Sequence, residues 1–529
     1  MLVPPIEASN VARSTASIKQ VQRRACPYPP PSAGSLRLVD NNVMNLGRLV
    51  AESDVLVARP PDVFDESVRD FEGRRPRLSW WPLVAIFGFF SILGLSLSSM
   101  VEAPRHWFNW YLAVAWSLYV PIAAVGIAGA HYSQKRGNGR IARSSYRGGT
   151  DRKVIFTVPS LCHPGSTNAL RRVLNSIIDH APGDLTRWRI DVVAEEGADL
   201  GLLEEMRRRP HVRVLVVPSS YETEQGARFK TRANQYAMEE RRRHGENGAD
   251  TFIYHLDDDT HVGADTVASL AEFIETESDH HYLAQGILTF PRELTPSRLA
   301  WYCDAIRPAD DLTRFAFFTG KLGRPLGGLH GEHVVIRADI EDEIGWDYRD
   351  TVIEDAYFAL EFAQRYPGRS TTLKSFSYGA SPSSVAELVR QRRRWAEGLL
   401  RLVFKRSLPW RAKLPLFYTV LCWAAAPVQF MPLMVGIAML LGVPALPPYG
   451  WVTVIWATEV ATLIWQYIQG LKVNLAASRS AQTVWWRVAL CVPGIFLFGA
   501  IETYAAVLGI IRFAGIGRQR ESEVIAKPL

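Results

Sequence analysis

Five long apolar runs constrain the fold of this chain more than any other feature of its sequence. Each reaches or exceeds the roughly 20 residues that a helix needs to cross the hydrocarbon of a bilayer. Tryptophans gather near their ends, as they do at membrane–water interfaces. The runs therefore predict an integral membrane protein with an α-helical transmembrane region. They are Trp80–Met100, Trp110–Ala130, Leu414–Val443, Trp451–Leu471 and Val488–Ile511.

Basic residues flank the runs unevenly and predict their orientation. They gather at 74–77, 135–143 and 472–487. Because Lys and Arg favour the cytosolic side of a membrane, we expect the N-terminus and the central region in the cytosol, at the plasma membrane if the chain is bacterial. Five full crossings would export the basic C-terminus, so either one late segment is broken or re-entrant, or the third run passes twice. The candidate break points are Pro427, Pro432 and Pro493.

The sequence around these runs divides the chain into six expected parts. The first part is rich in Pro, Ser and Arg and has no sustained period, which is typical of a disordered tail. The parts are a tail at 1–78, two membrane helices at 79–132, a cytosolic domain at 150–388, amphipathic interfacial helices at 389–412, C-terminal membrane helices at 413–513 and a tail at 514–529.

Composition narrows the partners. The formal net charge is +7, which suits anionic lipid or a phosphorylated ligand. The sequence contains no nucleic-acid motif of specific spacing, so we expect no nucleic-acid partner. The five cysteines are scattered without a C-x-x-C pair, which argues against a disulfide framework or a zinc site and fits a reducing compartment.

The central part alternates strand-like and helix-like patterns. β-branched apolar runs predict four strands, and helical spacing predicts two helices between them. This alternation predicts βαβ units and a mostly parallel sheet, with ligands beyond the carboxyl ends of the strands. Glu195 and Glu196 follow one strand end, and three aspartates follow another. The strands are expected at 153–160, 188–197, 212–220 and 250–257, and the helices at 168–180 and 231–244.

Asp257, Asp258 and Asp259 form the densest acidic cluster of this part. On an extended segment the first and third side chains share a face, and the middle one points away. Asp257 and Asp259 therefore predict a site for one hard divalent cation, Mg²⁺ or Mn²⁺, beside phosphate. An EF-hand calcium loop is excluded, because Val262 and Ala268 stand where its glycine and glutamate belong. The structural alternative is a solvated acidic turn that caps the next helix.

Two further motifs follow in the chain. The segment VIEDAYFALEFAQRYPGRS (352–370) starts an amphipathic helix with Glu354 and Asp355; acids at a helix N-terminus are also ordinary partners of the helix dipole. The segment VRQRRRWAEGLLRLVF (389–404) predicts an amphipathic helix on the membrane surface. A solvated basic face on lipid headgroups would explain it equally well.

In this order, the three motifs resemble those of processive-type members of the inverting glycosyltransferase family 2. The matching residues are Asp257 and Asp259 of D-x-D, Glu354 and Asp355 of E-D, and Gln391, Arg394 and Trp395 of Q-x-x-R-W. Over roughly residues 150 to 525 the chain is closer to egghead-type β-1,4-mannosyltransferases, membrane enzymes that add mannose to a glucosyl lipid. That likeness rests on the segments FKTRANQYAME, HLDDDT, IEDAYFA, SPSSVAELVRQRRRWAEG and AIETYAAVLG.

The resemblance implies a fold and a reaction. The fold is α/β, a GT-A domain with a Rossmann-like mixed sheet, cytosolic and joined to α-helical membrane segments. The reaction moves a hexose, most of all mannose, from GDP-mannose or a UDP-hexose to a lipid-linked or saccharide acceptor beside membrane lipids, and forms a β-linkage. A polysaccharide synthase that also exports its chain stays open, although no F-x-V-T-x-K segment follows the last run. An inactive scaffold that binds sugar nucleotides is the third alternative.

The resemblance also implies residue roles. Asp257 and Asp259 would hold Mg²⁺ or Mn²⁺, Asp355 beside Glu354 would accept the acceptor's proton, and Trp395 would stack on the acceptor sugar. Arg394 and Gln391 would face the diphosphate. The donor side would include Lys230, Asp258 and either Glu195 or Glu196, which replace the family's aspartate; Asn234 replaces a usual leucine.

Some polar residues near these motifs have two readings each. His330 and His333 in GGLHGEHVV, and His255 and His261 beside the aspartates, would contact metal or phosphate, or else make structural hydrogen bonds. Glu459 and Glu502 lie inside apolar runs, where acids face a polar cavity or the protein interior. They would line an acceptor path or make buried structural hydrogen bonds.

Overall fold

The computed structural model describes residues 75–99, 106–137, 144, 146–163, 166–349, 353–405, 407–426, 428, 431–442, 450–478 and 484–515. Nearly all of the expected N-terminal and C-terminal tails lies outside these residues, and so does Pro427.

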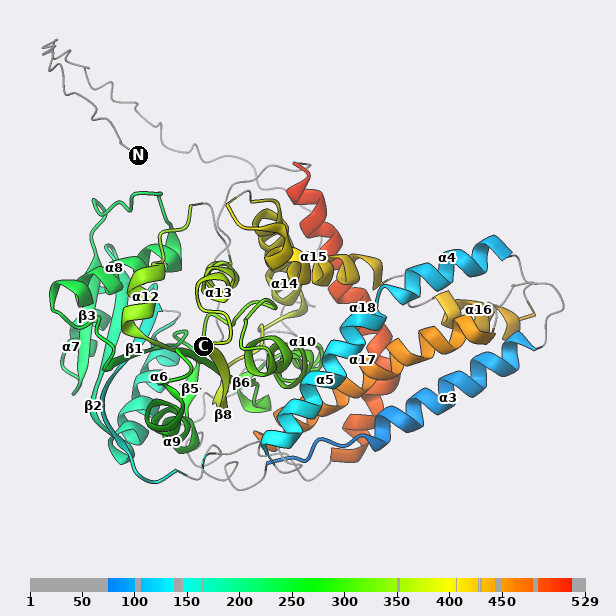
Figure 1. The fold of residues 1–529 in the computed structure, drawn as a ribbon, viewed down its shortest axis with the longest axis horizontal. Helices are drawn as coiled ribbons and strands as arrows, with labels where there is room; N and C mark the ends of the chain where they lie inside the picture. Colours follow the sequence, from blue (N-terminus) through cyan, green and yellow to red (C-terminus); the bar gives the residue numbers. More distant parts are fainter. Residues whose placement is uncertain are drawn as a thin grey trace, which may run out of the picture. The chain divides into compact units, whose positions relative to one another are not determined.

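An eight-stranded sheet organises the central region of the described residues (Figure 1). Its order is β3-β2-β1-β4-β7-β6-β8-β5. The first four strands are parallel, as expected, whereas β7 pairs antiparallel with both β4 and β6, so the sheet is mixed. The strands are β1 (Thr150–Ser160), β2 (Leu185–Glu195), β3 (Val212–Val217), β4 (Thr251–His255), β5 (His261–Val262), β6 (Leu283–Thr289), β7 (Val334–Arg337) and β8 (Ser370–Tyr378). The four predicted strands are confirmed as β1 to β4.

Helices cover both faces of the sheet. Because side chains alternate along a strand, Val154, Phe156 and Val158 of β1 face one core, with α6, α7 and α9, while Ile155 faces another, with α12 and α13. α8 packs on the second face, against β1, β2 and β3. The helices are α6 (Thr167–His180), α7 (Leu200–Arg207), α8 (Phe229–Arg243), α9 (Ala264–Glu272), α12 (Ala338–Ile344) and α13 (Glu354–Arg365), with the short turns η2 (Ala181–Gly183), η3 (Phe273–Glu277) and η4 (Arg292–Leu294). The two helices predicted between the strands are confirmed as α6 and α8.

Long apolar helices flank the sheet domain in the chain. Three helical stretches of the described residues are long and apolar enough to cross a membrane: Trp81–Ser98, Asn109–Arg136 and Trp486–Phe513. They correspond to the first, second and fifth predicted runs. The helices are α3 (Trp81–Ser98), α4 (His106–Ser117), α5 (Val120–Arg136), α15 (Trp410–Ala425), α16 (Met431–Leu440), α17 (Gly450–Ala476) and α18 (Val484–Phe513).

The third and fourth predicted runs do not form any of these three candidate membrane-spanning helices. The third divides into α15 and α16, of 16 and 10 residues, each shorter than the roughly 20 residues of a full crossing. The fourth forms α17, in which the polar side chains of Glu459, Gln469 and Asn474 are buried. The number of crossings and their orientation stay predictions.

The hairpin of α3 to α5 begins and ends at the sheet domain. Arg75, just before α3, pairs with Asp265 of α9 and lies 4.2 Å from the ring centroid of Phe376. Arg136, at the end of α5, donates to Glu277 at 3.0 Å. The two basic flanks of this hairpin therefore lie against the same domain.

Four more helices connect the sheet to the apolar helices. They are α10 (Arg298–Cys303), α11 (Ile306–Asp310), the wide helix η5 (Asp311–Lys321), which follows α11 directly, and α14 (Val385–Phe404). α14 begins four residues before the boundary expected at 389, and it packs against α15 and α18. In Figure 1, α10 and α14 lie between the sheet and the apolar helix α5. α11 and η5 contact β6 on one side and the apolar helices α17 and α5 on the other.

Candidate active site

The aspartate cluster follows the end of β4, at the carboxyl edge of the parallel half of the sheet. Asp258 is buried and accepts a hydrogen bond of 2.7 Å from the hydroxyl of Ser160, at the end of β1. Asp257 and Asp259 are only half-buried. The middle aspartate thus contacts the neighbouring strand, while the outer two remain partly accessible.

A third carboxylate joins the outer two aspartates. Oxygen atoms of Asp257, Asp259 and Glu332 all lie within 4.8 Å of one another. The strand register explains this, because β7 runs antiparallel to β4 with His255 opposite Val334, which brings residue 332 beside residue 257. Three hard oxygen donors suit Mg²⁺ or Mn²⁺.

Sequence reasoning missed Glu332, because only the histidines of GGLHGEHVV were considered as ligands. Its acidic residue stands two positions before an apolar run, VVIR, that forms β7. An acid next to a strand that pairs with β4 is the signal that would have found it.

Lys230 supplies a positive charge within this acidic group. Its ammonium, in the first turn of α8, donates to Asp257 and to the carbonyl oxygen of Gly331, the latter at 2.7 Å. Burial disfavours the charged amine, but the charges of Asp257 and Glu354 outweigh it and raise the pKa of Lys230. Lys230 therefore stays protonated in the site.

Glu354 and Asp355, at the start of α13, lie against the same loop. A Cβ atom added to Gly331 would lie 2.8 Å from the Lys230 ammonium, 3.6 Å from Asp355 Oδ2 and 3.7 Å from Glu354 Oε1. Lys230, Gly331, Glu354 and Asp355 line one pocket. The D-x-D and E-D motifs, far apart in the chain, thus meet in one site around Lys230.

Both carboxyls of the pair bind protons more tightly than usual. Burial, followed by the charge of Asp355, raises the pKa of Glu354 to about 7. Burial also raises the pKa of Asp355, although the Lys230 ammonium and the backbone N–H of Ala356, 2.8 Å from Asp355 Oδ1, favour its charged form. A carboxylate with a raised pKa is a stronger base near neutral pH.

The Q-x-x-R-W motif lies on α14, and its tryptophan lies beside two arginines, one of which reaches the site. The guanidinium carbons of Arg392 and Arg307 lie 4.3 Å and 5.4 Å from the ring centroid of Trp395. Gln391 accepts a hydrogen bond of 3.0 Å from Arg392, and Arg394 is half-buried on the same helix. Arg307 also donates to Glu332, so Trp395 is linked to the carboxylate group by one side chain.

Glu195 and Glu196 lie outside the carboxylate group. Glu195, at the end of β2, pairs with Arg232 of α8. The exposed Glu196 accepts a hydrogen bond of 2.5 Å from the backbone N–H of Ser219. The side chain of Ser219, followed by this N–H, lowers the pKa of Glu196. Because Arg232 lies two residues after Lys230, the end of β2 and the aspartates border the same turn of α8.

The four histidines near the motifs make structural contacts. His255 pairs with Glu341 at 2.8 Å, and His261 contacts the carbonyl oxygen of Tyr378 at 2.9 Å. His333 contacts the Tyr254 hydroxyl, and His330 donates to Asp311. Burial above all lowers the pKa values of His261 and His333 to about 3, which keeps both neutral. These contacts favour the structural reading of all four.

Glu502 of α18, one of the two acids predicted inside apolar runs, contacts an arginine. Arg392 donates to it at 2.8 Å and also pairs with Asp304, which is fully buried. This contact favours the structural reading of Glu502. Glu459 is buried in α17.

Comparison with known proteins finds similar sequences among glycosyltransferases. Residues 252–500 match the family described as glycosyl transferase family group 2. The chain is 27% identical to β-1,4-mannosyltransferase egh of Drosophila melanogaster. The alignment of 368 residues covers 68% of this chain and 74% of that protein. It is 26% identical over 296 residues to β-1,4-mannosyltransferase bre-3 of Caenorhabditis briggsae, covering 56% of this chain and 61% of that protein.

Solved structures show a distant likeness. The mannosyltransferase PcManGT from Pyrobaculum calidifontis, in complex with GDP-Man and Mn²⁺, has a TM-score of 0.41 and 13% identity, over 76% of this chain and 99% of that chain. S. aureus TarS 1-349 has a TM-score of 0.30 and 14% identity, over 69% of this chain and 92% of that chain. With its mixed sheet, its converging acidic motifs, its match to glycosyl transferase family group 2 and its similarity to β-1,4-mannosyltransferases, the chain is a glycosyltransferase.

Proposed function

We propose that this glycosyltransferase is a membrane-bound, inverting enzyme that transfers one hexose from a nucleotide-diphosphate sugar to a lipid-linked or saccharide acceptor. The observation that carries the proposal is the meeting of Asp257, Asp259, Glu332, Lys230 and Asp355 in one site. The relatives named as β-1,4-mannosyltransferases favour mannose as the sugar and a β-linkage as the product, and the proposed donor is GDP-mannose.

The donor side carries most of the charge. Asp257, Asp259 and Glu332 would hold Mg²⁺ or Mn²⁺, and the bound cation would neutralise the leaving diphosphate. Lys230 adds a fixed positive charge from the protein itself, and Arg394 of Q-x-x-R-W would contact the diphosphate. Gln391, Asp258 and the pair Glu195 and Glu196 complete the proposed donor side.

On the acceptor side, a base has to take the proton of the attacking hydroxyl. Asp355 has this role in the proposal, because its raised pKa makes it an effective acceptor near neutral pH. The hydroxyl then attacks the anomeric carbon from the face opposite the diphosphate, and one displacement inverts the linkage. Trp395 would lie beside the acceptor sugar.

The membrane presents the acceptor in this proposal. Three helices of sufficient length and apolar character support attachment to lipid. The contacts of Arg75 and Arg136 with the sheet domain support a hairpin whose two ends share the domain's side, which we propose to be the cytosol.

Donor and product can be tested together. Purified full-length protein is incubated with an alkyl β-glucoside and Mn²⁺ or Mg²⁺, using GDP-mannose, UDP-glucose and UDP-galactose as separate donors, and the products are sized by mass spectrometry. We expect one added hexose and the fastest turnover with GDP-mannose. A ladder of long chains would support a polysaccharide synthase instead, and faster turnover with a UDP-sugar would overturn the choice of donor.

A further inference from the structure

Arg307, at the start of α11, contacts both sides of the proposed site. Its guanidinium donates to Glu332 Oε1 at 3.2 Å and lies 5.4 Å from the ring centroid of Trp395. A second ring, that of Phe290, lies 4.4 Å from the same guanidinium carbon. Only 10% of the side chain is exposed, so its contacts act with little screening by water.

The carboxylate of Glu332 is held at both oxygens. Oε1 accepts from Arg307, and Oε2 accepts from the hydroxyl of Thr260, which directly follows Asp259. Two directional contacts restrict the side-chain rotamer. The orientation of the third carboxylate of the cation group therefore depends on Arg307.

Arg307 is itself held by a series of buried charges that reaches α18. Its Nη1 lies 3.8 Å from Asp304 Oδ2, and Asp304 pairs with Arg392. Arg392 donates to Glu502 at 2.8 Å and also lies over Trp395. Alternation of sign offsets the cost of burying these charges.

The helix that carries Arg307 supports the whole loop from Gly327 to His333. Besides the contact of Arg307 with Glu332, Asp311 accepts a hydrogen bond from His330. Further along, Arg314 donates to the carbonyl oxygen of Gly327 at 3.0 Å. Arg307, Asp311 and Arg314 are four and three positions apart, as on one side of a helix, and all three contact this loop.

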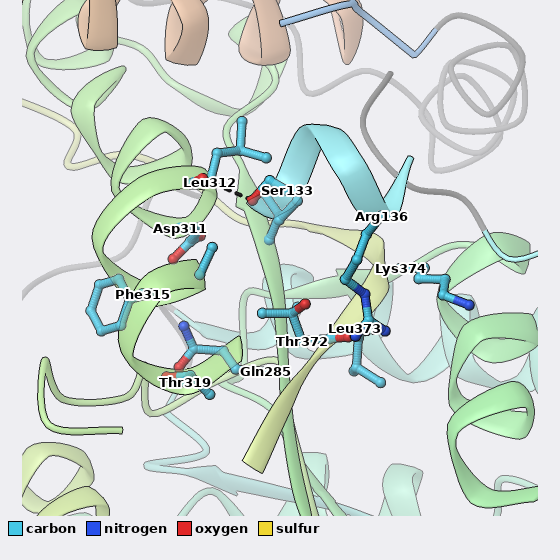
Figure 2. Close-up of a pocket in the computed structure, with 13 residues that line it drawn as sticks. Ser133, Arg136, Gln285, Asp311, Leu312, Phe315, Thr319, Thr372, Leu373 and Lys374 are labelled. Atoms are coloured by element: carbon cyan, nitrogen blue, oxygen red, sulfur yellow. Dashed lines mark hydrogen bonds between the residues drawn. The ribbon is translucent and has the colours of Figure 1, made fainter. Parts of the chain in front are cut away.

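The opposite side of this helix packs closely against apolar helices. Ser133 of α5 donates to the carbonyl oxygen of Leu312 at 2.8 Å, beside a pocket that Asp311 also lines (Figure 2). A Cβ atom added to Gly129 of α5 would lie 1.7 Å from the Thr313 carbonyl oxygen, and one added to Gly470 of α17 would lie 1.7 Å from that of Ala305. Contacts this close leave the helix little freedom to shift.

We propose that Arg307 is a positioning residue that orients Glu332 toward the cation and Trp395 toward the acceptor, with the apolar helices fixing its place. The proposal rests on the proposed function, since it assumes that Glu332 is a cation ligand. It predicts that loss of Arg307 weakens cation binding and acceptor recognition together, although Arg307 touches neither ligand in the proposal.

The test measures Mn²⁺ binding directly, by the loss of the free-ion EPR signal, in full-length protein purified in detergent. Arg307→Met should weaken Mn²⁺ binding by about 10- to 100-fold, the usual cost of removing a partner of a metal ligand, and should raise KM for the alkyl β-glucoside. Arg307→Lys keeps the positive charge, so its Mn²⁺ affinity and its KM for the alkyl β-glucoside should lie between those of the native protein and those of Arg307→Met. The matched control is Arg189→Met, which removes ion pairs with Asp191 and Glu246 and should leave both readouts unchanged.

The outcomes separate the inference from the function on which it rests. Native-like Mn²⁺ binding and acceptor KM in folded Arg307→Met would overturn the role of Arg307 alone. If Arg307→Met does not fold, Arg307→Gln takes its place. Native-like Mn²⁺ binding and a native-like acceptor KM in Arg307→Gln would then overturn the role of Arg307. Native protein that binds no Mn²⁺ would overturn the cation site, and the inference with it.

Discussion

The ammonium of Lys230 contacts Asp257, the first residue of the D-x-D motif, although the two belong to different elements of the fold. Lys230 also donates to the carbonyl oxygen of Gly331 at 2.7 Å, and the nearby charges of Glu354 and Asp355 help to raise its pKa. One basic side chain therefore joins the carboxylates proposed for the cation to those proposed for proton transfer.

Replacing Lys230 by Met should lower kcat/KM for the sugar nucleotide by about 10- to 100-fold, because a hydrogen bond to a charged group contributes about 1.5–3 kcal/mol. Lys230→Arg should lose less. Lys153→Met is a matched control, since Lys153 pairs with Glu246 at 2.5 Å near the start of β1. Steady-state kinetics with varied donor checks the prediction, and a native kcat/KM in Lys230→Met would contradict it.

Asp355→Asn should reduce kcat by about 10²- to 10⁴-fold, the usual contribution of a positioned base, while donor binding stays close to native. The reason is that the amide keeps the shape of the side chain but cannot accept the proton. Calorimetric titration with GDP-mannose measures donor binding, and single-turnover assays measure the rate of the sugar-transfer step. Asp199→Asn, at the N-cap of α7, is the control; near-native turnover in Asp355→Asn would exclude it as the base.

The stability of the fold should depend on pH through Glu354, whose pKa is raised to about 7. A folded-state pKa above the unfolded value means that the folded protein holds its proton to higher pH, so stability falls as pH rises from about 4 to about 7. Glu354→Gln cannot ionise and should exceed the native protein in stability at pH 8, by at most about 3 kcal/mol, with no advantage at pH 4.

Thermal unfolding of the metal-free protein at both pH values measures this difference. Glu293→Gln, a change at an exposed acid, should show no such dependence. An advantage of Glu354→Gln that is the same at both pH values would mean that ionisation is not its cause.

Chelation of divalent ions should abolish transfer, and added Mn²⁺ or Mg²⁺ should restore it. Glu332→Gln should raise the Mn²⁺ concentration for half-maximal activity by about tenfold or more, because one of three carboxylate ligands loses its charge. Activity at a series of buffered Mn²⁺ concentrations provides the measurement. Unchanged Mn²⁺ dependence in Glu332→Gln would remove it from the cation group.

The pair of Arg392 and Glu502 should contribute to stability. Removing one partner of a buried ion pair leaves an uncompensated charge and costs about 3–5 kcal/mol. We expect Arg392→Met and Glu502→Gln each to lower the unfolding temperature, and the double variant to lose less than their sum. Strictly additive losses would show that the two side chains do not act as a pair.

Local patterns in the sequence predicted a large part of this site. A continuous apolar run indicated β4, and Asp257 and Asp259 follow its end, where ligands of parallel sheets bind. The helical period that begins at Glu354 indicated α13 with its acidic pair at the N-terminus. Each of these features depends on one short segment, so its own period was sufficient.

Contacts between distant segments were beyond such patterns. Glu332 joins the aspartates because β7 pairs antiparallel with β4, and Arg392 finds Glu502 at a separation of 110 residues. The apolar run at 414–443, for which the sequence left open a break or two passes, forms α15 and α16. By itself the sequence predicted the long apolar helices, the strands β1 to β4, the helices α6 and α8 and the two acidic motifs, because each of these features follows from the pattern of one segment. Only the tertiary structure decided which side chains meet, because strand register and helix packing depend on the whole chain.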